Sequence, residues 1–112
     1  MHTQTDPIPN KTDQKMHRQR LAIGILIKNG KLEQAQEIAA QTRDAKAHAI
    51  LAHGYMSAGL IEQARAEFLK SVKLEPANQE AIRHVVAINL YLAARHARDN
   101  QLEQASNYLR EA

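Results

Sequence analysis

Histidine is the residue type most able to form a chemical site in this chain of 112 residues, which contains six histidines and no cysteine. Two histidines of one helix can share a metal ion when they lie three or four residues apart. His48 and His53 are five residues apart, and His84 and His96 are twelve apart. We expect no carboxylate to join either pair, so the sequence predicts no metal site and no cofactor. His48 and His96 are predicted to be packing residues, each with one satisfied ring nitrogen.

Motifs that would indicate catalysis are also missing from the sequence. It has no cysteine nucleophile, no Gly-x-Ser-x-Gly, no glycine-rich phosphate loop and no isolated pair of acids on an apolar face. Glu33, Glu62 and Glu103 recur at one position of a repeated phrase. Recurrence of this kind is typical of charges that compensate the helix dipole in a first turn. We therefore predict that the chain is not an enzyme.

Composition and charge favour a single helical domain with a solvated surface. Hydrophobic residues make up 44% of the chain and aromatic residues 4%, with Ala and Leu predominant among the apolar set. The 15 basic and 12 acidic residues are interspersed, and the net charge is +3. A nucleic-acid footprint requires basic residues clustered on one face, so we predict no nucleic-acid partner.

The sequence shows no targeting segment or membrane span. Its first ten residues are polar, with Pro7 and Pro9, and they lack the apolar stretch of a signal peptide. The apolar run from Leu21 to Ile27 is seven residues long, whereas a span needs about 20. We predict a cytoplasmic protein without membrane insertion.

Helical periodicity divides the chain into a flexible tail over residues 1–11 and a helical domain over residues 12–112. Helices are expected at about 12–28, 32–41, 45–58, 60–74, 79–98 and 101–111, with no segment of strand alternation. All connections are short, so consecutive helices must pack antiparallel. The predicted fold is all-α, with about six helices in three antiparallel hairpins.

A short phrase occurs at each expected hairpin turn. It occupies residues 30–35, 59–64 and 100–105, and each copy contains Leu or Ile followed by Glu-Gln-Ala. Each copy begins with a turn residue, which is Gly30, Gly59 or Asn100. A phrase that recurs between helices indicates a stack of helical hairpins.

The middle hairpin resembles the tetratricopeptide repeat (TPR) family. Over residues 45–78 its residues fall at the spacings of the 34-residue TPR pattern: His48, Leu51, Ala52, Tyr55, Gly59, Ala64, Phe68 and Pro76. The flanking copies are irregular, because the recurring alanines Ala35, Ala64 and Ala105 are 29 and 41 residues apart. The resemblance implies three TPR-like hairpins stacked as a short solenoid.

In TPR proteins the first helix of each hairpin lines a concave groove that takes a peptide or helix. The resemblance therefore implies these groove residues: Arg20, Lys46, Ala49, His53, Met56, Arg83, Leu90 and Ala94. The family's clamp for a terminal carboxylate is not expected, because Gly24 and Ile50 replace its asparagines. We expect a groove of mixed basic and apolar character that suits an amphipathic helix with some acidic residues. An exposed face with no ligand is the alternative.

The last predicted hairpin lacks a capping helix. Leu102, Ala105, Tyr108 and Leu109 lie next to Ala112, where the given sequence stops. They would either pack against the helix before them or leave an apolar face for self-association.

Two functional hypotheses follow from these patterns. The first is a non-catalytic protein-interaction module, such as an adaptor, a chaperone-like protein or an assembly factor, that binds a partner peptide or helix in the groove. The second is a structural subunit that forms a homo-oligomer or joins a larger complex through its terminal hairpin.

Overall fold

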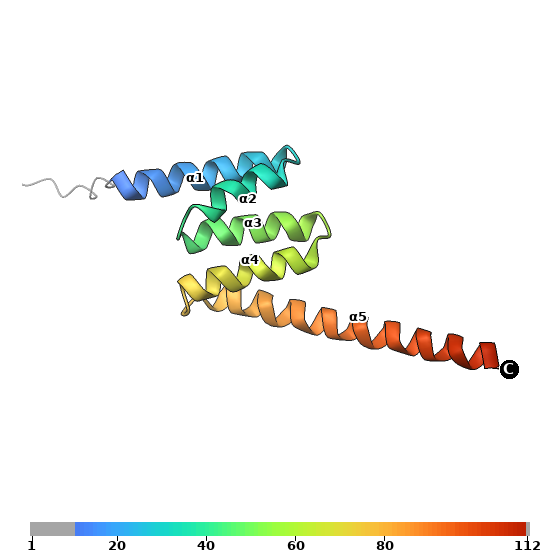
Figure 1. Ribbon diagram of the computed structural model, residues 1–112. Coiled ribbons are helices and arrows are strands. Elements are labelled where there is room, and N and C mark those ends of the chain that lie inside the picture. Colours follow the sequence, from blue (N-terminus) through green and yellow to red (C-terminus); the bar gives the residue numbers. More distant parts are fainter. Residues whose placement is uncertain (1–10, 112) are drawn as a thin grey trace, which may run out of the picture.

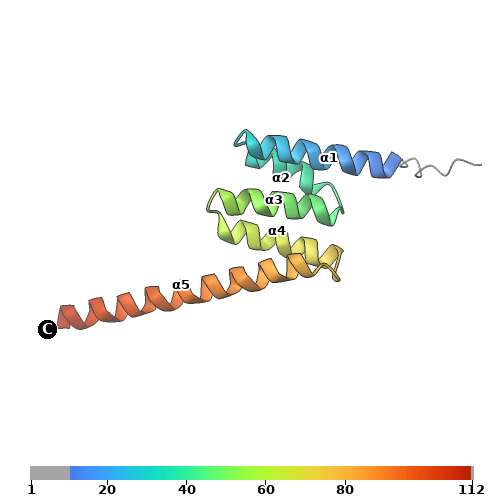
Figure 2. The same ribbon diagram turned by 180° about the vertical axis from the view of Figure 1, so that it is seen from behind.

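The computed structural model describes residues 11–111, which form five helices and no strand. The helices are α1 (Lys11–Lys28), α2 (Leu32–Ala40), α3 (Ala45–Ser57), α4 (Ile61–Leu74) and α5 (Gln79–Glu111). They stack in chain order, and α5 extends well beyond the others (Figure 1). The view from behind shows the same order (Figure 2). Of the tail predicted over residues 1–11, only Lys11 lies within the described residues, and it begins α1.

Two glycines reverse the chain at the predicted hairpin turns. Gly30 and Gly59 have φ values of 74° and 78°, in the left-handed region that glycine enters without steric cost. After α1, the Lys31 amide donates to the Leu26 carbonyl at 2.8 Å, and Gly30 donates to Ile27 at 3.0 Å. These paired bonds form a Schellman motif, which satisfies the last carbonyls of a helix.

The same motif ends α3, where the Leu60 amide donates to Tyr55 at 2.9 Å and Gly59 donates to Met56 at 3.0 Å. Directly after each turn, the alanine of the repeated phrase enters the core. Ala35 and Ala64 are both 0% exposed, so they let α2 and α4 approach the helix before them. The phrase is therefore a turn followed by a packing contact.

The core is centred on the α3–α4 hairpin. Leu51 of α3, Phe68 of α4 and Ile23 of α1 are fully buried together. The hydroxyl of Ser71 donates to the Ala45 carbonyl at 2.8 Å and ties the end of α4 to the start of α3. Helices α1 and α2 pack against α3, and α5 packs against α4. The hairpin is thus the element that joins the rest.

The prediction of a third hairpin is wrong. We expected helices over 79–98 and 101–111 with a turn at Asn100, but α5 continues through all of these residues. No residue between Gln79 and Glu111 is Gly or Pro, and Asn100 does not adopt a positive φ. A left-handed turn is more costly for asparagine than for glycine, so the third copy of the phrase remains helical. The described chain has two hairpins and one long helix, five helices in place of about six.

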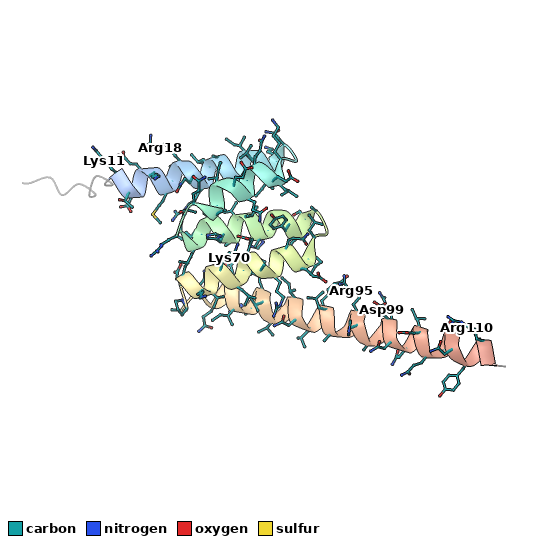
Figure 3. All side chains as sticks on the ribbon, viewed as in Figure 1. Lys11, Arg18, Lys70, Arg95, Asp99 and Arg110 are labelled. Carbon is teal, nitrogen blue, oxygen red and sulfur yellow. The ribbon has the colours of Figure 1, made fainter. Side chains whose placement is uncertain are left out.

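The C-terminal part of α5 has no packing partner among residues 11–111. Ile88 is 3% exposed against α4, whereas Leu102 is 63% and Leu109 is 78% exposed. Figure 3 shows that the part of α5 beyond Asp99 extends away from the stack, with no other described element beside it. The expected self-association residues therefore lie on an uncovered helix: Leu102, Ala105, Tyr108 and Leu109.

A membrane span was not expected, and none of the helices described over residues 11–111 combines the length and the apolar character that crossing a membrane would require.

Close approach of α1 and α3 at Gly54 gives a test of the stack. A Cβ atom at Gly54 would lie 2.8–2.9 Å from side-chain atoms of Ile27. Gly54→Ala should therefore lower the free energy of unfolding by about 1–3 kcal/mol, measured by urea denaturation. Gly24→Ala is the matched control, because a Cβ at Gly24 has nothing within 4 Å. It should raise stability by up to about 1 kcal/mol, since alanine favours the helix. Equal effects of both substitutions would contradict this packing.

Candidate functional site

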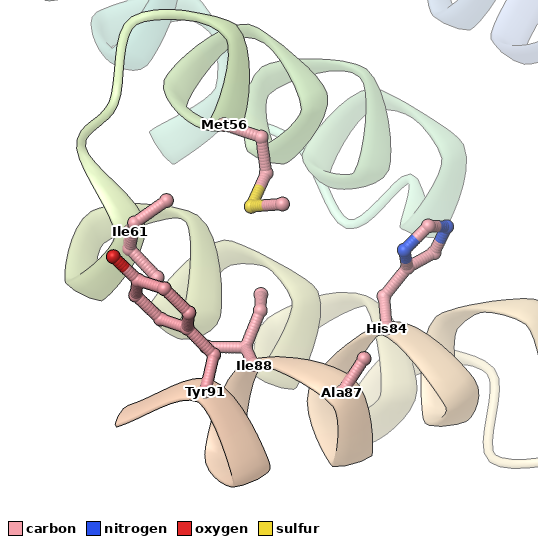
Figure 4. A pocket seen from close by; sticks show the side chains of 6 residues that line it. All are labelled: Met56, Ile61, His84, Ala87, Ile88 and Tyr91. Carbon is pink, nitrogen blue, oxygen red and sulfur yellow. The ribbon is translucent and has the colours of Figure 1, made fainter. Parts of the chain in front are cut away.

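A groove runs between α3 and α5 over the surface of α4, and we call it the α3–α5 groove. It consists of two adjoining pockets that share His84. The first pocket, of about 330 Å³, is mainly apolar. Figure 4 shows its lining residues, which come from α3, α4 and α5: Met56, Ile61, His84, Ala87, Ile88 and Tyr91.

The second pocket, of about 360 Å³, is more polar and lies toward the start of α3. Phe68 of α4 forms part of its wall, and Arg20 reaches it from α1. The remaining lining residues come from α3, from the start of α5 and from Asn78, which directly precedes α5: Lys46, Ala49, Ile50, His53, Asn78, Glu80, Ala81 and His84. The groove therefore has an apolar end and an end with charged side chains.

The structure places the predicted groove residues in two groups. Arg20, Lys46, Ala49 and His53 line the polar pocket, and Met56 lines the apolar one. The three residues predicted on α5 line neither pocket: Arg83, Leu90 and Ala94.

The face of α5 that lines the groove differs from the predicted face by a rotation of about one residue. Ala81 and Ile88 are 2% and 3% exposed and form the seam of α5 against the stack. This seam turns His84 and Tyr91 toward α3, while Leu90 is 67% exposed. The seven-residue spacing of Ala81 and Ile88 is the sequence signal that could have set the correct face.

Three rings form a cluster where the two pockets meet. His84 stacks on Phe68 with ring centroids 4.7 Å apart and an interplanar angle of 11°. The His53 ring meets Phe68 at 5.1 Å and His84 at 4.8 Å, both edge to face. Phe68 is fully buried, so it fixes the positions of both imidazoles. Burial lowers the pKa of His53 below its ordinary value of 6.5, and His84 lowers it further. His53 is therefore neutral at pH 7.

Arg20, one of the predicted groove residues, forms an ion pair with Asp44. Its Nη2 donates to Asp44 Oδ1 at 2.9 Å, and its Nε donates to the other carboxylate oxygen. Asp44 also accepts the Lys46 amide and so caps α3. No ion pair of the Lys46 side chain occurs within residues 11–111. Lys46 is thus the cation that the polar pocket offers to an incoming acidic group.

A buried charged pair lies behind the groove. His48 Nδ1 is 2.7 Å from Glu67 Oε1, and His48 Nε2 is 3.0 Å from the Thr42 carbonyl oxygen. Both nitrogens face acceptors, so both must donate and the ring is an imidazolium. The hydrogen bond to Glu67 raises the pKa of His48. Burial acts to raise the pKa of Glu67, but hydrogen bonds from His48 and Lys70 outweigh it and lower that pKa.

The predicted roles of two histidines need correction in light of this pair. His48 is a packing residue, as expected, but it is 5% exposed and has both ring nitrogens bonded, where one was predicted. His96 was also predicted to be a packing residue, but it is exposed on α5.

One cluster of potential metal ligands was not predicted from the sequence. The ligand atoms of His53, Glu80 and His84 all lie within 4.8 Å of one another, a grouping able to hold a metal ion. Glu80 lies four residues before His84, but the sequence-based expectation concerned only the pairs His48–His53 and His84–His96, and this cluster contains neither pair. His53 comes from another helix, so spacing along one helix could not reveal the set.

Comparison with known proteins gave no relative of this chain. No protein-family model matches it, and searches of curated proteins and of solved structures found no match. The resemblance to TPR repeats therefore remains a prediction from residue spacing.

The His48–Glu67 pair should make stability depend on pH on both sides. The raised pKa of His48 means that its contribution is complete below pH 6.5 and is lost as pH rises through the folded-state value. The lowered pKa of Glu67 means that its contribution is complete above pH 4.5 and is lost as pH falls through its folded-state value.

We therefore expect the free energy of unfolding to decrease above pH 6.5, with a slope of at most about 1.4 kcal/mol per pH unit. In His48→Gln this decrease should disappear, as measured by urea denaturation at a series of pH values. His96→Gln should keep it, because His96 is exposed. An unchanged slope in His48→Gln would mean that the pair is not charged in the folded state.

Proposed function

We propose that the chain is a non-catalytic protein-interaction module that binds an amphipathic helix of a partner protein along the α3–α5 groove. The observation that supports this most directly is the division of the groove into an apolar end and a polar end, where the Lys46 side chain has no ion pair within residues 11–111. The agreement of residues 45–78 with the TPR pattern adds support, because repeats of that family present such grooves to partners.

The chemistry of the groove specifies the occupant. An apolar stripe at i, i+3 or i+4 and i+7 would enter the pocket lined by Met56, Ile88 and Tyr91. An acidic side chain near one end of the same helix would reach Lys46 in the polar pocket. The partner is therefore a helix with an apolar face and a negative end. As in most protein interfaces, apolar anchors supply affinity, while charge sets orientation.

A displayed library of helical peptides tests this function. Panning against the full chain should enrich helices with an apolar stripe and an acidic end. Met56→Asp should weaken binding of the enriched peptides by at least about tenfold, because it places a charge in the apolar pocket. Lys46→Glu should select against the acidic end.

Lys73→Glu is the charge-matched control, because Lys73 is exposed on α4 and lines neither pocket. It should leave peptide affinity unchanged. Enrichment of no helix, or equal losses in Lys46→Glu and Lys73→Glu, would refute binding in the groove.

The uncovered end of α5 favours a second candidate function, self-association. Leu102, Ala105 and Leu109 form one stripe at i, i+3 and i+7. In the two earlier copies of the phrase, the equivalent helix packs antiparallel onto the helix before it. We propose that a second copy of α5 takes this role for the third copy, in an antiparallel pair with twofold symmetry.

Light scattering across a wide concentration range tests the self-association. The wild-type mass should rise above the 12.6 kDa of one chain as concentration increases. Leu102→Glu combined with Leu109→Glu should hold the protein at the monomer mass. Gln104→Glu with Asn107→Asp adds the same charge to the opposite face of α5 and should leave association intact. A wild-type monomer at every concentration would exclude this candidate.

A further inference from the structure

The junction of the two pockets places three metal-ligating side chains together. His53 projects from α3, and Glu80 and His84 lie one helical turn apart on α5. All three ligand atoms lie within 4.8 Å of one another, and His84 Nε2 is 3.9 Å from Glu80 Oε1. Apart from that approach, no hydrogen bond engages the ring nitrogens of His53 or His84 within residues 11–111. Their lone pairs are therefore available.

The donor set fits a particular class of ion. Two imidazole nitrogens and one carboxylate oxygen are the ligands of open zinc sites, which keep a further position for water or another ligand. Imidazole also suits Co²⁺, Ni²⁺ and Cu²⁺, whereas Mg²⁺ and Ca²⁺ prefer all-oxygen sites. Metal–ligand bonds of 2.0–2.1 Å place tetrahedral ligands about 3.3 Å apart. The cluster must therefore contract slightly around an ion.

The surroundings allow that contraction and orient the ligands. Phe68 is fully buried and contacts both imidazole rings, so the rings are positioned before an ion binds. The Glu80 side chain is 71% exposed and free to rotate inward. Arg20 and Lys46 are the two cations that line the same pocket, and Arg20 is already neutralised by Asp44.

We propose that His53, Glu80 and His84 form a binding site for a zinc-class divalent cation, with an open coordination position that faces the α3–α5 groove. The ion joins α3 directly to α5, a helix that otherwise packs mainly on α4. It therefore fixes the width of the groove. This inference is independent of the proposed helix-binding function, because the ion alone is its ligand.

Titration of the untagged, chelator-treated full chain with Co²⁺ tests the site. One equivalent should bind and give visible absorption bands typical of four- or five-coordinate cobalt, and Zn²⁺ should displace it. His84→Ala and Glu80→Gln should each weaken binding by more than about tenfold, with loss of the bands. Glu80→Gln is the safer variant for folding because Glu80 is exposed, and circular dichroism checks the helix content of both.

His17→Ala and His96→Ala are the matched controls, because both histidines are exposed and lie outside the cluster. They should retain the affinity and the absorption bands. The proposal is overturned if wild-type protein gives only octahedral, weakly absorbing cobalt, or if Glu80→Gln and His84→Ala bind as tightly as the controls. Binding that is lost in the controls would assign the ion to other histidines and would also overturn it.

Discussion

The buried pair of His48 and Glu67 is the interaction on which the rest of the structure depends. It joins α3 to α4 at 2.7 Å, and the second ring nitrogen of His48 holds the connection that follows α2. A buried ion pair adds little net stability over an apolar pair, but removal of one partner costs about 3–5 kcal/mol. The pair therefore fixes the register of one hairpin more than it strengthens it. The other three helices pack on that hairpin.

The groove follows from this arrangement. Phe68 comes directly after Glu67 on α4, and it is the buried ring against which His53 and His84 pack. The first half of α5 closes the groove, and the second half leaves the stack without a partner. The proposed helix binding, pairing of two copies and metal binding all involve α5: the pairing would use its second half, and the other two would use its first half. The first and the last share His84, so a bound ion would also shape the apolar pocket.

Local chemistry made much of this fold predictable. Gly30 and Gly59 predict turns because only glycine enters the left-handed region freely, and both turns occur where expected. The turn predicted at Asn100 does not occur, since asparagine permits a left-handed turn without requiring it. Groove residues on α1 and α3 could be placed from a repeat pattern, but the face of α5 depends on how Ile88 seats against α4. The His53–Glu80–His84 cluster joins two helices, and no spacing within one helix reports such contacts.

Amide hydrogen exchange, measured residue by residue at low protein concentration, tests the central claim most directly. If the α3–α4 hairpin is the stable unit around which the other helices pack, its amides should exchange slowest, because they open only on global unfolding. Protection should fall along α5 and should be weak beyond Asp99, where no described element covers the helix. Strong protection of residues 101–111 in the monomer, or slower exchange in α1 than in α3 and α4, would contradict the account.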